Sequence, residues 1–130
     1  MTALLLIEDN ADAARMVRKA LALTDYEIHH ATTGLDGLKL ARTVQPDIVL
    51  VDMNLPDLEG KAIVVQLRGG ILTPQATLIA FTAEDDARTR RVTRALGCDG
   101  LIGKPIDTRI FAEQITQIVQ GKVGRPGHGK

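Results

Sequence analysis

At 130 residues the chain is long enough for one globular domain with a single hydrophobic core, and too short for two. Apolar residues make up 45% of it and charged residues 25%, which excludes disorder for most of its length. The 16 basic residues balance 16 acidic ones, so the chain lacks the broad basic field with which domains bind nucleic acid.

The cysteine content and the hydropathy indicate the cellular compartment of the protein. Cys98 is the single cysteine, so no internal disulfide can form and nothing points to an oxidising compartment. No apolar stretch reaches the roughly 18 residues that a bilayer span needs. The start, MTALLLIEDN, has no basic segment and is not a signal peptide. We therefore expect a cytoplasmic protein with no membrane or nucleic-acid partner.

Short apolar segments alternate with helical patterns along the chain. The predicted strands are residues 3–7 (ALLLI), 27–31 (EIHHA), 48–51 (IVLV), 77–81 (TLIAF) and 101–102 (LI). Apolar residues recur at helical spacing in the segments that follow each of them. Short strands that are apolar on both faces and alternate with helices predict an α/β fold, in which helices cover both faces of a parallel sheet.

Glycines indicate where the later helices end. The third helix is expected to stop near Gly69–Gly70, the fourth at Gly97 and the fifth at Gly121. The final segment, GKVGRPGHGK, is rich in glycine and polar residues, and it offers little apolar surface to bury. We therefore expect one folded domain over residues 1–121 and a disordered tail over residues 122–130.

Polar residues follow three of the predicted strands directly, and one follows a fourth strand after a single glycine. Glu8 and Asp9 follow the first strand and Asp52 follows the third. Thr82 follows the fourth strand, and Lys104 follows the fifth after one glycine. Parallel strands end at the same edge of a sheet, so these side chains are expected to converge where open α/β sheets bind their ligands.

Helix capping is the simpler explanation for any one of these residues, and Asp9 or Asn10 could cap the first helix. Capping explains the whole set poorly, because carboxylates crowded together repel and resist ionisation. One ammonium, from Lys104, does not balance them, whereas Mg²⁺ with oxygen ligands does. Such a site suits phosphoryl transfer, with Asp52 as nucleophile and with Thr82 and Lys104 contacting the phosphoryl oxygens.

At this point the motifs resemble those of a known family, the response-regulator receiver domains of two-component signalling. The matching motifs are Glu8-Asp9, Asp52 in VDMNLPDLEG, Thr82 in FTAED, and Lys104-Pro105 in GKPI. Together, in this order and at these spacings, they are highly specific. The resemblance covers residues 3–121, nearly the whole chain.

The resemblance implies a flavodoxin-like, doubly wound fold with five parallel strands in the order 2-1-3-4-5. It implies that Mg²⁺ is bound by Asp9, Asp52 and the backbone carbonyl of Asn54, and that Glu8 reaches the metal largely through water. It also implies a cis peptide between Lys104 and Pro105.

In function, the resemblance implies that Asp52 accepts a phosphoryl group from a histidine kinase or a histidine phosphotransfer protein. The new charge pulls Thr82 inward and shifts an equilibrium on the face formed by the fourth helix, fifth strand and fifth helix, where a target protein binds. Such chemotaxis-type, stand-alone receivers are monomers or weak dimers, and they catalyse only their own phosphorylation and dephosphorylation.

One residue departs from the family pattern. Receivers often carry a tyrosine or phenylalanine three residues before the lysine, where it changes rotamer as the threonine moves. Here that position is Leu101, so the switch chemistry is complete but the usual aromatic lever is absent.

Several alternatives stay open or are disfavoured on particular residues. A phosphorelay intermediate that passes its phosphoryl group onward is not separable by sequence from an effector that binds a target. A haloacid-dehalogenase-type phosphatase needs a second aspartate where this chain has Asn54. A flavodoxin-like nucleotide or flavin site needs a glycine- or hydroxyl-rich first loop, and EDNAD is acidic. The complete acidic set argues against a receiver-shaped module that is never phosphorylated.

Overall fold

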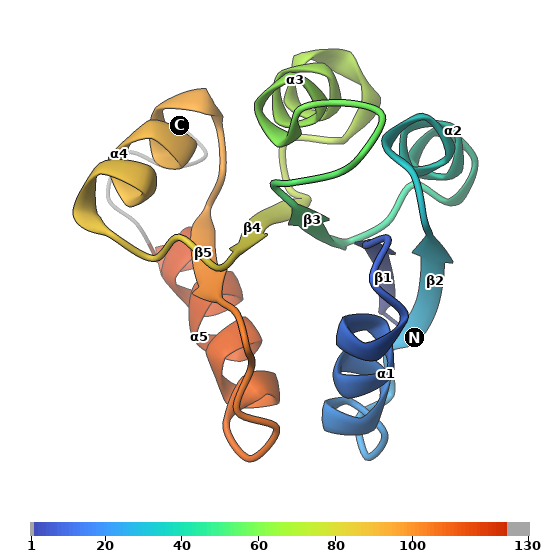
Figure 1. The fold of residues 1–130 in the computed structure, drawn as a ribbon, viewed down its shortest axis with the longest axis vertical. Coiled ribbons are helices and arrows are strands. Elements are labelled where there is room, and N and C mark those ends of the chain that lie inside the picture. The colour runs from blue at the N-terminus through green and yellow to red at the C-terminus, as the bar shows by residue number, and fades with distance from the viewer. Residues whose placement is uncertain (1, 125–130) are drawn as a thin grey trace.

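The computed structural model describes residues 2–124, which form one parallel sheet with helices on both sides (Figure 1). The strands are β1 (Ala3–Ile7), β2 (Glu27–Ala31), β3 (Ile48–Asp52), β4 (Thr77–Thr82) and β5 (Gly100–Gly103). The helices are α1 (Ala11–Ala20), α2 (Gly34–Val44), α3 (Gly60–Gln66), α4 (Ala87–Leu96) and α5 (Phe111–Gly124). The strand order is β2-β1-β3-β4-β5, so the predicted fold and strand order are confirmed.

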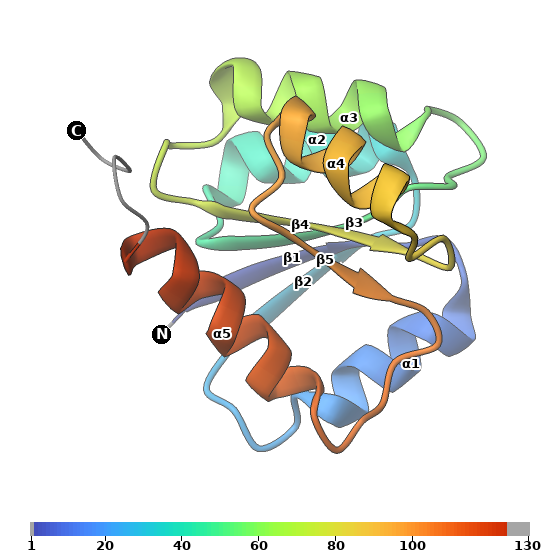
Figure 2. The same ribbon diagram turned by 90° about the vertical axis from the view of Figure 1, so that its left-hand side faces the viewer.

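Two apolar clusters hold the helices to the sheet, one on each face. Figure 2 shows α2, α3 and α4 on one face of the sheet and α1 and α5 on the other. The strands alternate between them: Leu5 and Ile7 of β1 face the α2, α3 and α4 side, whereas Leu4 and Leu6 face the α1 and α5 side. All four side chains are fully buried. This two-sided burial explains why the strands read as continuous apolar runs.

The N-termini of three helices are capped by side chains that sequence preferences favour. Asn10 accepts a hydrogen bond from the backbone N–H of Ala13 at the start of α1, so Asn10, rather than Asp9, is the cap. Thr33 and Asp86 accept equivalent bonds at the starts of α2 and α4. Asp9 is therefore free of this role, which matters for the site described below.

The end of α3 differs from the expected stop. The chain continues through a π-helical turn, η1 (Leu67–Ile71), within which Gly70 adopts a φ of 155°. Gly97 ends α4 with a φ of 120°, as its position predicted. At both positions the backbone lies in a region that residues with a Cβ atom rarely adopt.

The expectation that the ordered chain would end at Gly121 is wrong, because α5 continues to Gly124. Lys122, predicted to belong to a disordered tail, is buried, and its Nζ lies 3.0 Å from Oδ2 of Asp99. An ion pair with a residue far away in sequence compensates for the two glycines near the helix end, and composition alone could not reveal it. Residues 125–130 of the expected tail lie outside the described residues.

Asp99 forms a charged cluster with Arg68 and Lys122 at the edge of the sheet opposite the strand ends discussed above. Its Oδ2 accepts hydrogen bonds from Arg68 Nη2 at 3.0 Å and from the backbone N–H of Leu78 at 2.9 Å. Arg68 also donates to the carbonyls of Gly97 and Ala76. The cluster joins η1, the α4–β5 turn and the end of α5, and it depends on one carboxylate. Among the described helices, none is long and apolar enough to cross a membrane.

We expect Asp99→Asn to lower the free energy of unfolding by about 3 kcal/mol, because it leaves Arg68 and Lys122 without their shared anion. The matched control is Asp107→Asn, whose exposed pair with Arg109 is screened by solvent and should contribute little to stability. Urea unfolding of both variants measures the difference. Equal losses would show that the Asp99 cluster does not hold α5 to the domain.

Candidate functional site

The polar residues predicted to converge do lie together at the carboxyl edge of the sheet. Because β1 and β3 are neighbours, Glu8 and Asp9 after β1 lie beside Asp52 at the end of β3. Thr82 is the last residue of β4, next to β3, and Lys104 follows β5. β2, at the outer edge of the sheet, contributes no residue to this acidic cluster.

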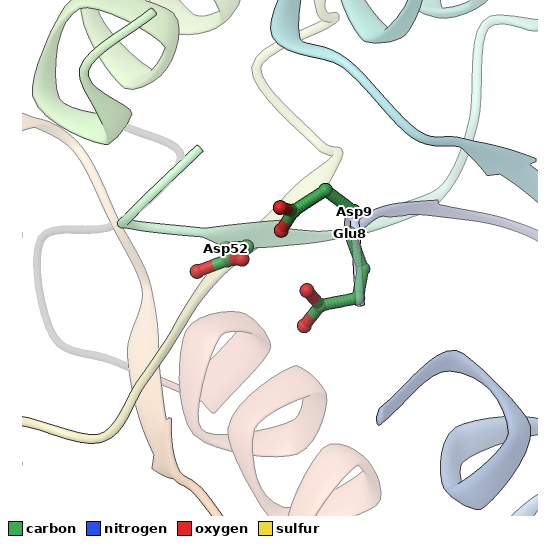
Figure 3. Close-up of side chains that lie close together, drawn as sticks. All are labelled: Glu8, Asp9 and Asp52. Carbon is green, nitrogen blue, oxygen red and sulfur yellow. The ribbon is translucent and has the colours of Figure 1, made fainter. Parts of the chain in front are cut away.

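The three carboxylates surround one small space (Figure 3). One oxygen from each of Glu8, Asp9 and Asp52 lies within 4.8 Å of the others. Glu8 is fully buried and Asp52 is 3% exposed, whereas Asp9 reaches the solvent. Two buried carboxylates and one exposed carboxylate therefore form a site that opens outward through Asp9.

Lys104 supplies the positive charge of the site. Its Nζ lies 2.6 Å from Oε1 of Glu8 and 3.4 Å from Oδ2 of Asp52. The same ammonium lies 4.8 Å from the centre of the Phe81 ring. The backbone N–H of Lys104 donates to the carbonyl of Thr82, and the Lys104–Pro105 peptide is cis. One cation thus contacts two of the three anions.

Burial and the neighbouring groups shift the pKa values of the two buried carboxyls in opposite directions. Burial raises the pKa of Glu8, and the neighbouring Asp52 raises it further against the opposing effect of Lys104. Burial would also raise the pKa of Asp52, but the Glu8 carboxyl, the backbone N–H of Asn54 and Lys104 together hold it below its usual value. Asp52 is therefore an anion at neutral pH, as a nucleophile must be.

The donor set fits Mg²⁺. The available ligands are oxygens, which hard divalent cations prefer, and they come from adjacent strand ends. Oε1 of Glu8 is buried and lacks a hydrogen bond among the described residues, since the approach of Lys104 does not have hydrogen-bond geometry. Three carboxylates facing one ammonium leave uncompensated negative charge. Asp9 and Asp52 would hold the cation directly, and Glu8 lies behind them.

Thr82 and Asn54 flank Asp52. The backbone N–H of Asn54 donates to Oδ1 of Asp52 at 2.9 Å, and the hydroxyl oxygen of Thr82 accepts from the backbone N–H of Glu84 at 3.1 Å. Both residues also line a cavity of about 570 Å³ between α3 and α4, whose rim carries Lys61 and Arg88. The hydroxyl of Thr82 is thus already engaged with the loop that leads into α4.

Two contacts at the site had no signal in the sequence. His30 in β2 places Nε2 2.8 Å from the backbone carbonyl oxygen of Glu8, and Asp57 bonds to the start of α2. His29 has an acidic partner within its own strand: its Nε2 lies 2.7 Å from Oε1 of Glu27, two residues earlier on the same face of β2. The contacts of His30 and Asp57 join residues that are far apart in sequence, so local spacing could not show them.

Comparison with known proteins agrees with this geometry. Residues 4–116 match the family model described as response regulator receiver domain. The chain is 31% identical over 111 residues to the polar-differentiation response regulator DivK of Brucella ovis, covering 85% of this chain and 90% of that protein. It is 29% identical over 120 residues to the transcriptional regulatory protein KdpE of Mycobacterium tuberculosis, covering 92% of this chain. It spans about half (52%) of the length of KdpE.

Solved structures share the fold. The chemotaxis response regulator CheY4 of Vibrio cholerae superimposes with a TM-score of 0.84 at 22% identity, covering 91% of this chain and 98% of that chain. The receiver domain of a DNA-binding response regulator from Colwellia psychrerythraea gives a TM-score of 0.81 at 26% identity, covering 92% and 99%.

We expect Asp9→Asn to have opposite effects on thermal stability with and without Mg²⁺. Without the cation the variant should melt above the parent, because one of three repelling carboxylates is gone. With Mg²⁺ the parent should gain stability by mass action, about 2.7 kcal/mol at a hundredfold excess over its dissociation constant, and the variant should gain little.

Asp12→Asn is the control for this measurement, because Asp12 is an exposed aspartate on α1 that pairs with Arg15. It should keep the full response to Mg²⁺. An Asp9→Asn protein that is stabilised by Mg²⁺ as strongly as the parent would exclude Asp9 as a ligand.

Proposed function

Because this chain belongs to the response regulator receiver domain family, we propose that it is a signalling switch that accepts a phosphoryl group on Asp52 with bound Mg²⁺. The observation that supports this most directly is the position of Asp52. It ends a central strand, it is nearly buried, and it shares one space with Glu8, Asp9 and the ammonium of Lys104.

The residues of the site support a direct transfer of the phosphoryl group from its donor to Asp52. A carboxylate oxygen of Asp52 attacks phosphorus, the bond from phosphorus to the donor breaks, and the donor nitrogen or oxygen leaves with that electron pair. Asp52 needs no base, because its carboxyl is already ionised at neutral pH. Bound Mg²⁺ would neutralise charge on the phosphoryl oxygens. Lys104 would contact one of those oxygens, and the Thr82 hydroxyl would donate to another.

We propose that the donor is a histidine kinase or a histidine phosphotransfer protein and that the output face is formed by α4, β5 and α5. Arg88, Arg91 and Arg94 are exposed on α4, and Arg90 pairs with Asp85. A basic helix of this kind complements a target with an acidic surface. Transfer back to a phosphotransfer protein would instead make the chain a phosphorelay intermediate.

The switch itself is proposed to run through Thr82 and the loop after β4. If the Thr82 side chain rotates inward to donate to a phosphoryl oxygen, its hydroxyl oxygen moves away from the backbone N–H of Glu84, so the loop should rearrange. Leu101 is 7% exposed and packs in the core cluster beneath α4, beside a small open pocket of about 60 Å³. A packed leucine without a hydroxyl has little to gain from changing rotamer.

We expect acetyl phosphate with Mg²⁺ to label the protein once, at Asp52, because only this carboxylate combines ionisation, Lys104 contact and a central strand end. Intact mass measurement of the parent and of Asp52→Asn checks this. Asp12→Asn is the control and should be labelled fully. Undiminished labelling of Asp52→Asn, or labelling that survives complete chelation of divalent ions, would contradict the proposal.

We expect beryllofluoride, a phosphoryl mimic, to change the backbone of residues 83–86 and to leave Leu101 in one rotamer. The reason is that Thr82 is bonded to this loop while Leu101 is packed. Methyl and amide NMR spectra of the protein with Mg²⁺, with and without beryllofluoride, measure both. A strong rotamer change at Leu101 with a stationary loop would show that the coupling runs through β5.

A further inference from the structure

The loop between β3 and α3 carries Asn54 and therefore fixes one wall of the acidic site. Its two ends are held to each other: the backbone N–H of Gly60 donates to the carbonyl of Met53 at 3.3 Å, and Asn54 and Glu59 form an isolated antiparallel bridge. The approach is so close that a Cβ on Gly60 would lie 2.5 Å from the Cα of Met53. This closure shapes the loop but does not attach its tip to the rest of the domain.

Asp57 makes that attachment. Its Oδ1 accepts from the backbone N–H of Gly34 at 2.8 Å, and its Oδ2 accepts from the backbone N–H of Leu35 at 3.0 Å. Among the described hydrogen bonds of residues 54–59, these are the ones that reach an element other than β3 and α3. The tip of the loop is thus bound to the first turn of α2, which lies beside α3 (Figure 1).

The Asp57 carboxylate and the first turn of α2 are chemically suited to each other. The first N–H groups of a helix have no partner within the helix, and they favour a carboxylate through the helix dipole. Thr33 accepts only from the N–H of Asp36, so Gly34 and Leu35 need an acceptor from elsewhere. The two donors hold the pKa of Asp57 below its usual value, so the carboxylate is ionised when it binds them.

The packing around Gly34 makes the contact specific for this loop. A Cβ at Gly34 would lie 2.8 Å from Ile63 Cδ1 and 3.1 Å from Leu58 Cβ. The start of α2 therefore touches α3 and the loop directly, without an intervening side chain of its own. Because Asp57 directly precedes Leu58, this packing brings its carboxylate within hydrogen-bond distance of the N–H groups of Gly34 and Leu35.

We propose that Asp57 is a positioning residue for the cation site: its bidentate contact with α2 holds the β3–α3 loop so that Asn54 stays in place beside Asp52. The inference rests on the proposed function, since it assigns a role toward Mg²⁺. The Asp57 contact connects the site to α2, which packs on β1 and β2, at the end of the sheet far from β5.

The variants Asp57→Ala and Asp36→Ala test the inference as a matched pair. Both remove one negative charge from the first turn region of α2, but Asp36 is exposed and makes no side-chain hydrogen bond to the loop among the described contacts. Asp57→Asn, which keeps one acceptor oxygen, is the conservative variant. Calorimetric titration with Mg²⁺ alone, thermal unfolding, and NMR exchange of the Asn54 and Gly60 amides without Mg²⁺ are measured for each.

Asp57→Ala should weaken Mg²⁺ binding about tenfold, the size of effect seen when a residue that orients a metal ligand is lost. Asp36→Ala should leave it within about twofold, because an exposed charge is screened by salt. Asp57→Asn should recover part of the loss. The amides of Asn54 and Gly60 should exchange faster in Asp57→Ala than in Asp36→Ala, even if both variants lose similar thermal stability through weaker capping.

Equal Mg²⁺ affinities or equal amide exchange in Asp57→Ala and Asp36→Ala would overturn the inference and leave the proposed function intact. Absence of Mg²⁺ binding by the parent protein would contradict the proposed function and remove the role of Asp57 with it. The two failures are therefore distinguished by the parent titration.

Discussion

The crowding of Glu8, Asp9 and Asp52 at the ends of β1 and β3 is the constraint on which the rest of the site depends. Two of these carboxyls are buried, so their repulsion is poorly screened, and one ammonium lies between them. The arrangement keeps Asp52 ionised while burial and Asp52 raise the pKa of Glu8. Because the negative charge at the site is not balanced, a ligand that supplies positive charge should stabilise the domain. Hydrogen-bond donors at the site would likewise stabilise an incoming anion.

The sheet order places this charge where it can act. β1 and β3 are hydrogen-bonded neighbours although β2 lies between them in sequence, so the strand order reverses there and their ends leave an open edge. β4 and β5 bring Thr82 and Lys104 to the same edge. The loops that leave these strands attach the edge to α2 through Asp57, and the bond between Thr82 and Glu84 joins it to the loop that leads into α4. A change in charge at Asp52 therefore has two routes into the helical layer.

Much of this could be predicted because the information is local. Apolar runs marked the strands, and polar residues directly after them marked the edge, so Glu8, Asp9, Asp52, Thr82 and Lys104 could be grouped before any coordinates. The bonds of Asp57 and His30 could not, because they join elements by tertiary packing and follow no spacing rule. The end of α5 was misjudged for the same reason: the composition around Gly121 indicates a break, but the ion pair of Lys122 with Asp99 keeps the helix in place.

Asp52 and its acidic neighbours are proposed to form one Mg²⁺-dependent phosphoacceptor site. A crystal structure of the protein with Mg²⁺ and beryllofluoride tests it most directly. The account predicts beryllium bonded to a carboxylate oxygen of Asp52, and Mg²⁺ at about 2.0–2.1 Å from oxygens of Asp9 and Asp52. It also predicts Lys104 and Thr82 in contact with the fluorides. Beryllofluoride at another carboxylate, or Mg²⁺ bound away from Asp9 and Asp52, would contradict the account.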